Sequence, residues 1–78
     1  MTTRMPGRVT HLSKKQGHGF ILGEGGCRVY FEKKALSGLN MHKLFIGSNV
    51  EYRVRYGPRI EAAEVRGAVR STRIRFNS

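Results

Sequence analysis

Residues 16–32 decide the fold, and they read QGHGFILGEGGCRVYFE. Two short apolar runs, about His18 to Leu22 and about Arg28 to Glu32, flank a segment that contains three glycines, Gly23 to Gly26. Glycine adopts the positive φ values that tight turns require, and runs of this length and composition are typical of β-strands. The segment therefore predicts a β-hairpin.

The register of this hairpin follows from its side chains. If Phe20 lies opposite Tyr30, then His18 lies opposite Glu32. A slip of one residue would mix aromatic and aliphatic side chains on both faces. We therefore expect the aromatic pair on the outer face and a core face formed by Ile21, Val29 and Phe31.

Three further strands are expected around the hairpin. The first spans about Gly7 to Ser13, and the turn Lys14–Gly17 joins it to the hairpin. The others are Asn49 to Tyr56 and about Arg59 to Arg66, on either side of the turn Gly57-Pro58. Apolar and charged residues alternate along the first of these two, as in a half-buried antiparallel strand; the apolar members are Val50, Tyr52 and Val54.

The rest of the chain is less regular. Lys33 to Leu36 is expected to form one helical turn, and Ser37 to Ser48 a long loop. Within the loop, one interpretation has Met41, Leu44, Phe45 and Ile46 close the end of a barrel. The other has Phe45, with His42 and Lys43, extend a binding surface. Close turns and the lack of a convincing helix predict a small all-β, five-stranded antiparallel barrel.

Composition sets the limits on function. The 78 residues include 15 Lys or Arg and five acidic residues, all Glu, for a net charge of +10 and a pI of 10.9. This is one domain, and its basic character points to nucleic acid. No apolar stretch approaches the ~18 residues of a membrane span, and the first residues lack the apolar run of a secretory signal. A single cysteine, Cys27, fits a reducing compartment, so a cytoplasmic protein is expected.

Catalytic and metal sites have little support. No phosphate-binding loop motif occurs, and the five Glu residues are scattered. The spacings of Cys27 and the three histidines match no structural zinc pattern. We therefore expect no enzyme activity, no cofactor and no bound metal.

The motifs resemble the cold-shock domain, a family of five-stranded OB-folds. GRVTHLS at residues 7–13 resembles the opening G-x-V-K-W-F-N, and QGHGFI at 16–21 resembles the first ribonucleoprotein motif, K-G-F-G-F-I. VYFEK at 29–33 lies where the second motif, V-F-V-H-F, is expected. AAEV at 62–65 resembles the closing A-A-N-V. The resemblance covers Gly7 to Val65 in the correct order.

The chain departs from the family pattern at aromatic positions. His11 stands at the family's Trp, Leu12 at the next Phe, and His18 at the first Phe of the first motif. Glu32 and Lys33 replace the His and the last Phe of the second motif. Of the family's usual aromatic platform, only Phe20 and Tyr30 keep full rings. If each lost ring removes ~1–3 kcal/mol of stacking, charge must contribute more of the binding, with a steep salt dependence.

The resemblance implies a protein that binds RNA or single-stranded DNA without catalysis, as an RNA chaperone or a regulator of transcription or translation. Its base-facing group is expected at His11, His18, Phe20 and Tyr30. Contacts with the phosphate backbone of the nucleic acid are expected from Lys14, Lys15, Lys33, Arg53 and Arg55. Gly17 and Gly19 are expected to allow the close approach, since glycine has no side chain.

Two alternatives stay open. The barrel that has lost base stacking is also suited to docking an acidic protein or the ribosome. His18 and Glu32 are either a cross-strand ion pair that raises the pKa of the imidazole or two independent polar groups.

A monomer is expected, divided into an N-terminal arm (1–6), the barrel (7–66) and a basic tail (67–78). The tail is either unstructured or a sixth strand near Ser71 to Phe76.

Overall fold

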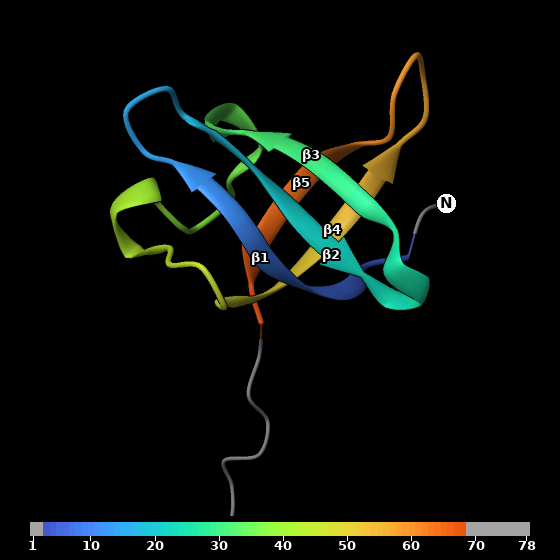
Figure 1. Cartoon of the computed structure of the whole chain (residues 1–78), viewed down its shortest axis with the longest axis horizontal. Coiled ribbons are helices and arrows are strands. Elements are labelled where there is room, and N and C mark those ends of the chain that lie inside the picture. The colour runs from blue at the N-terminus through green and yellow to red at the C-terminus, as the bar shows by residue number, and fades with distance from the viewer. Residues whose placement is uncertain (1–2, 69–78) are drawn as a thin grey trace, which may run out of the picture.

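The computed structural model describes residues 3–68 of the chain, which form a closed β-barrel. No α-helix occurs among these residues, and the coiled segments in Figure 1 are short 3₁₀ turns. The order around the barrel is β1-β2-β3-β5-β4. The all-β, five-stranded barrel is thus confirmed, with the bounds β1 Met5–Ser13, β2 His18–Gly23, β3 Arg28–Glu32, β4 Asn49–Arg55 and β5 Glu61–Gly67.

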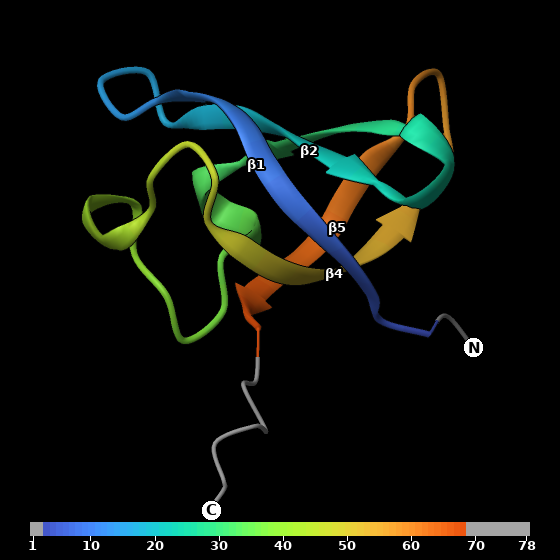
Figure 2. The ribbon, with the colours of Figure 1, turned by 60° about the horizontal axis from the view of Figure 1, so that its bottom comes forward.

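The strands form two layers. β1, β2 and β3 run side by side as one antiparallel layer, and β4 and β5 cross it on the other side of the core (Figures 1 and 2). The pairings β1–β4 and β3–β5 close the barrel.

One of these pairings corrects the expected topology. β3 and β5 run parallel, with Tyr30 opposite Glu61, so the expectation of a wholly antiparallel barrel was wrong here. The reason is geometric, because an odd number of strands in a closed ring cannot alternate in direction at every pairing. This parallel contact brings the β4–β5 connection next to Tyr30.

The predicted hairpin register is confirmed. Phe20 lies opposite Tyr30, and His18 lies opposite Glu32. The inward side chains of all five strands form one core, as the alternation of apolar residues indicated. The core contains Val9, Ile21, Val29, Phe31, Met41, Leu44, Val50, Tyr52, Val54, Ala62 and Val65.

The segment after β3 closes one end of the barrel. Lys33–Ala35 forms the expected helical turn, of the 3₁₀ type, and Met41–Lys43 forms another. Met41 and Leu44 are buried, whereas Phe45 is 64% exposed. The interpretation in which this loop closes the end of the barrel is therefore correct for Met41 and Leu44 and wrong for Phe45 and Ile46.

The ends of the barrel differ slightly from the expected limits. β1 begins at Met5, so part of the expected arm (1–6) pairs with β4. At the other end β5 includes Gly67. The basic residues Arg70, Arg73 and Arg75, and the proposed sixth strand, lie outside the described residues. No helix within residues 3–68 is long and apolar enough to cross a membrane.

Candidate nucleic-acid interface

Four rings form a continuous cluster on the outer face of β1, β2 and β3. The rings of Phe20 and Tyr30 meet edge to face with centroids 5.6 Å apart, and those of His18 and Tyr30 lie 5.9 Å apart. His11 completes the cluster, 5.9 Å from Phe20 and 6.4 Å from His18. We call His11, His18, Phe20 and Tyr30 the ring platform. The structure therefore brings together all four residues that the sequence proposed as base-facing.

A β-bulge explains how His11 reaches the platform. Val9 pairs with Ile21, but the next pair joins His11 to Phe20, so Thr10 is the extra residue. A bulge of one residue shifts the alternation of the strand and turns the following side chain to the other face. His11 therefore projects beside Phe20.

Two glycines shape the backbone beside the platform. Gly19 is opposite Leu12, where a Cβ would clash with the backbone oxygen of His11 and lie 2.8 Å from the Phe31 ring. Gly17 has a φ of +76° in the β1–β2 turn. Its carbonyl accepts a hydrogen bond of 2.8 Å from the backbone N–H of Lys33. Both glycines thus allow a close backbone approach, as expected.

Two arginines that the sequence interpretation missed lie over the platform. The guanidinium carbon of Arg28 is 5.7 Å from the centroid of Phe20, and that of Arg59 is 3.9 Å from the centroid of Tyr30. Guanidinium groups stack on aromatic faces by cation–π attraction. The strand period indicates Arg28, two residues before Tyr30, whereas Arg59 depends on the parallel β3–β5 contact.

The predicted lysines lie at the edge of the platform. Lys14 and Lys15 are exposed in the β1–β2 turn, and Lys14 reaches across to the long loop. Its Nζ donates to the carbonyl of His42 at 3.2 Å and lies 5.1 Å from the centroid of Phe45. Phe45 is thus an exposed ring beside a cation, next to the β1–β2 turn. Lys33 is exposed and lines a pocket of about 240 Å³ with His18 and Tyr30.

Of the two interpretations of His18 and Glu32, the structure does not show the cross-strand ion pair. The Nε2 of His18 donates to the Oε1 of Gln16 at 2.9 Å. The Glu32 carboxylate accepts from the Tyr30 hydroxyl at 3.2 Å and lies 3.4 Å from Nζ of Lys34. Each member of the cross-strand pair therefore has a nearer partner on its own strand or turn.

Tyr30 is held as a neutral phenol. Partial burial raises the pKa of Tyr30, and the hydrogen bond to Glu32 and the charge of that carboxylate raise it further. The phenol therefore adds no negative charge to the platform near neutral pH.

The two arginines of β4 occupy a different surface. Nε of Arg53 lies 3.4 Å from Oε1 of Glu64, which also lies 3.2 Å from Nη2 of Arg4. Arg55 lies 3.8 Å from Glu61. Because β4 lies between β1 and β5, the structure does not bring Arg53 to the ring platform. Arg55 lies beside Glu61, whose other arginine neighbour, Arg59, stacks on Tyr30.

Groups suited to metal or thiol chemistry are dispersed. Within residues 3–68 no three His, Cys or Glu side chains converge on one point. Cys27 is exposed in the β2–β3 connection.

The arrangement is a surface of rings and cations on the outside of the barrel. Planar rings bind planar ligands by stacking, and the surrounding ammonium and guanidinium groups attract anions. In comparisons with known proteins, no family model and no curated protein matches this chain.

Proposed function

We propose that this protein binds single-stranded RNA or DNA across the ring platform, as an OB-fold of the cold-shock type. The observation that carries the proposal is the continuous contact of His11, His18, Phe20 and Tyr30 on one sheet face. Unpaired bases stack on such surfaces because every base has an apolar face.

Charge supports the same surface. Lys14, Lys15 and Arg28 surround the platform, and within the described part of the chain none of them is in an ion pair with a carboxylate. Free cations release the counterions of phosphates when they bind, which favours association at low salt. The platform therefore combines stacking with phosphate neutralisation.

The ring content favours a weakly selective binder. Two of the four rings are imidazoles, which offer less stacking area than the indole and phenyl rings of the family pattern. Binding that depends on charge discriminates little between sequences. Weak selectivity suits an RNA chaperone or a general regulator of transcription or translation.

Titration with an octauridine strand tests the proposal. Phe20→Ala and Tyr30→Ala should each weaken binding by ~1–3 kcal/mol, since each removes a stacking surface. The matched control is Ile46→Ala, because Ile46 is 67% exposed and lies outside the platform. Octauridine affinity of the control should equal that of the wild type.

The salt series separates the competing functions. Affinity for octauridine should fall steeply between 50 and 200 mM salt, as phosphate contacts require. Equal octauridine affinity in the two platform variants and the wild type would contradict base stacking. If neither RNA nor DNA strands bind, the result would favour the alternative function, in which this surface docks against an acidic protein or the ribosome.

A further inference from the structure

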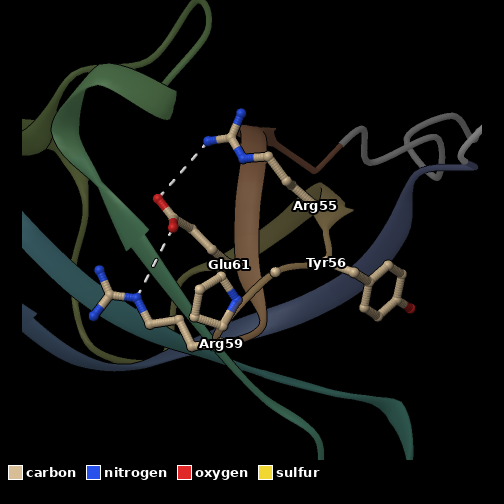
Figure 3. A pocket seen from close by; sticks show the side chains of 6 residues that line it. Arg55, Tyr56, Arg59 and Glu61 are labelled. Atoms are coloured by element: carbon tan, nitrogen blue, oxygen red, sulfur yellow. Dashed lines mark ion pairs between the residues drawn. The ribbon is translucent and has the colours of Figure 1, made fainter.

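A pocket lies beside the platform, in the hollow of the β4–β5 hairpin. This pocket has a volume of about 610 Å³. Volumes of this size accommodate a small organic ligand. Its lining consists of Arg55, Tyr56, Gly57, Pro58, Arg59 and Glu61. Figure 3 shows the two arginines reaching the Glu61 carboxylate from opposite sides, with the Tyr56 ring turned away.

The Glu61 carboxylate is positioned without being hydrogen bonded by these arginines. Its Oε2 lies 3.8 Å from Nη2 of Arg55, and its Oε1 lies 3.9 Å from Nε of Arg59. Hydrogen bonds of this type span roughly 2.7–3.2 Å, so both pairs are attractive but open. The side chain of Glu61 is only 22% exposed, which limits its access to water. A partly buried carboxylate with free acceptor sites favours a ligand that donates hydrogen bonds.

We propose that the hairpin pocket binds a guanine base of the strand, an inference that rests on the proposed function. Guanine carries two adjacent donors, N1–H and the N2 amino group, which match the two oxygens of one carboxylate. Its acceptors O6 and N7 match a guanidinium group. The pocket offers one such carboxylate, Glu61, and two such guanidinium groups, Arg55 and Arg59.

The other bases match this arrangement less well. Adenine and cytosine place a ring-nitrogen acceptor beside their amino donor, and that acceptor would face the carboxylate. Uracil and thymine present one donor between two carbonyl oxygens. Only guanine therefore satisfies both oxygens of Glu61 without placing an acceptor against them.

Arg59 connects the pocket to the platform. Its guanidinium lies 3.9 Å from the Tyr30 centroid, while its Nε faces Glu61. Guanidinium planes are themselves stacking surfaces for bases. A strand that crosses the rings from His11 to Tyr30 thus continues over Arg59 into the hairpin pocket.

The test uses the full chain and octauridine strands with one guanine placed in turn at each position. At the position that reaches the pocket, guanine should tighten binding about tenfold over uracil, the gain expected for a bidentate contact. Adenine there should give no gain. Inosine, which lacks the N2 amino group, should give only part of it.

Glu61→Gln is the decisive variant, because it keeps the size of the side chain and replaces one acceptor by a donor. The guanine gain should disappear, while octauridine affinity stays equal or rises through the loss of a negative charge. The matched control is Glu51→Gln, which removes the same charge from β4, outside the pocket. This control should keep the tenfold gain.

The outcomes separate the two proposals. Octauridine binding with no guanine gain at any position, or an equal gain in wild type and Glu61→Gln, would overturn the guanine site alone. Failure of all strands to bind would overturn the proposed function and the guanine site with it. Free guanosine monophosphate should bind more weakly than the octamer, since it lacks the contacts to the platform. Equal or tighter binding of the free nucleotide would overturn the assignment to a strand.

Discussion

The outer face of β1–β2–β3 and the outer face of β4–β5 carry cations in different ways. On β4–β5 the arginines share carboxylates, since Arg4 and Arg53 both lie against Glu64. Beside β1–β2–β3 the cations contact rings instead, since Arg28 lies over Phe20 and Lys14 of the β1–β2 turn lies over Phe45 of the long loop. Both faces of the barrel therefore carry positive charge. They differ in the partners of the cations, which are carboxylates on one face and aromatic rings on the other.

This difference shows why a net charge of +10 does not by itself locate a binding surface. A cation paired with a carboxylate adds little potential beyond the pair, whereas a cation over a ring keeps its full charge for an anion. The β1–β2–β3 face, where Lys14 and Arg28 have no carboxylate partner among the described residues, is thus the candidate for phosphate contact. On the paired face, which is that of Arg4, Arg53 and Glu64, the ion pairs contribute to the stability of the barrel.

The largest expected effect concerns the backbone beneath the ring platform. Gly19→Ala places a methyl group against the backbone oxygen of His11 and the Phe31 ring. Such overpacking should lower the free energy of unfolding by about 3 kcal/mol, measured by urea denaturation.

A glycine of the other face gives the matched control. Gly57 lies in the β4–β5 hairpin, where an added Cβ has no neighbour within 4 Å among the described residues. Gly57→Ala should therefore change the free energy of unfolding by no more than about 0.5 kcal/mol. Similar destabilisation by both substitutions would show that the ring face has no special packing constraint.

The second prediction compares cations of the two faces directly. Lys14→Gln/Lys15→Gln removes two cations beside the platform and should reduce the slope of log Kd against log salt by about 1.4 for octauridine. Arg4→Gln/Arg53→Gln removes the same charge from the paired face. Its effect on the slope should be less than half as large. Equal slopes in the two double variants would mean that charge acts regardless of its position.

Much of the ring platform could be predicted from the sequence, because alternate residues of a β-strand point to the same face of the sheet. The apolar residues of β2 and β3 fix the register, and that register places Phe20 opposite Tyr30. The same alternation places Arg28 on the outer face, although the sequence interpretation had not used it. Local patterns therefore suffice where neighbouring strands are joined by a short turn.

The rest of the site depends on contacts that no local pattern encodes. Arg59 reaches Tyr30 only because β5 pairs with β3 in parallel, after the chain has passed through β4. Likewise the sequence alone indicates no carboxylate partner for Arg53. In the structure its partner is Glu64, which lies opposite it in the β4–β5 pairing. Pairing between distant strands decided which cations are available.

The third prediction concerns the paired face and is smaller. Glu64→Gln removes the shared partner of Arg4 and Arg53, all of them partly exposed, so it should destabilise the barrel by less than about 1 kcal/mol. The loss should shrink in 1 M salt, where such pairs are screened. Glu24→Gln, in the exposed turn after β2, is the control and should be neutral. A loss for Glu64→Gln that persists in high salt would contradict an electrostatic origin.

The smallest expected effect is the titration of Tyr30, which links the platform to a carboxylate. Burial and the Glu32 carboxylate both raise the pKa of Tyr30, so the folded state favours the neutral phenol. This contribution to stability is complete below the ordinary tyrosine value of about 10 and is lost as the pH rises through the raised pKa. Glu32→Gln should lower the midpoint of the Tyr30 ring signals in an NMR titration toward the ordinary value, leaving the part due to burial. Identical midpoints in the wild type and in Glu32→Gln would show that Glu32 does not influence the Tyr30 phenol. Glu32 would then have no more electrostatic effect on the platform than Glu64 has from the other face.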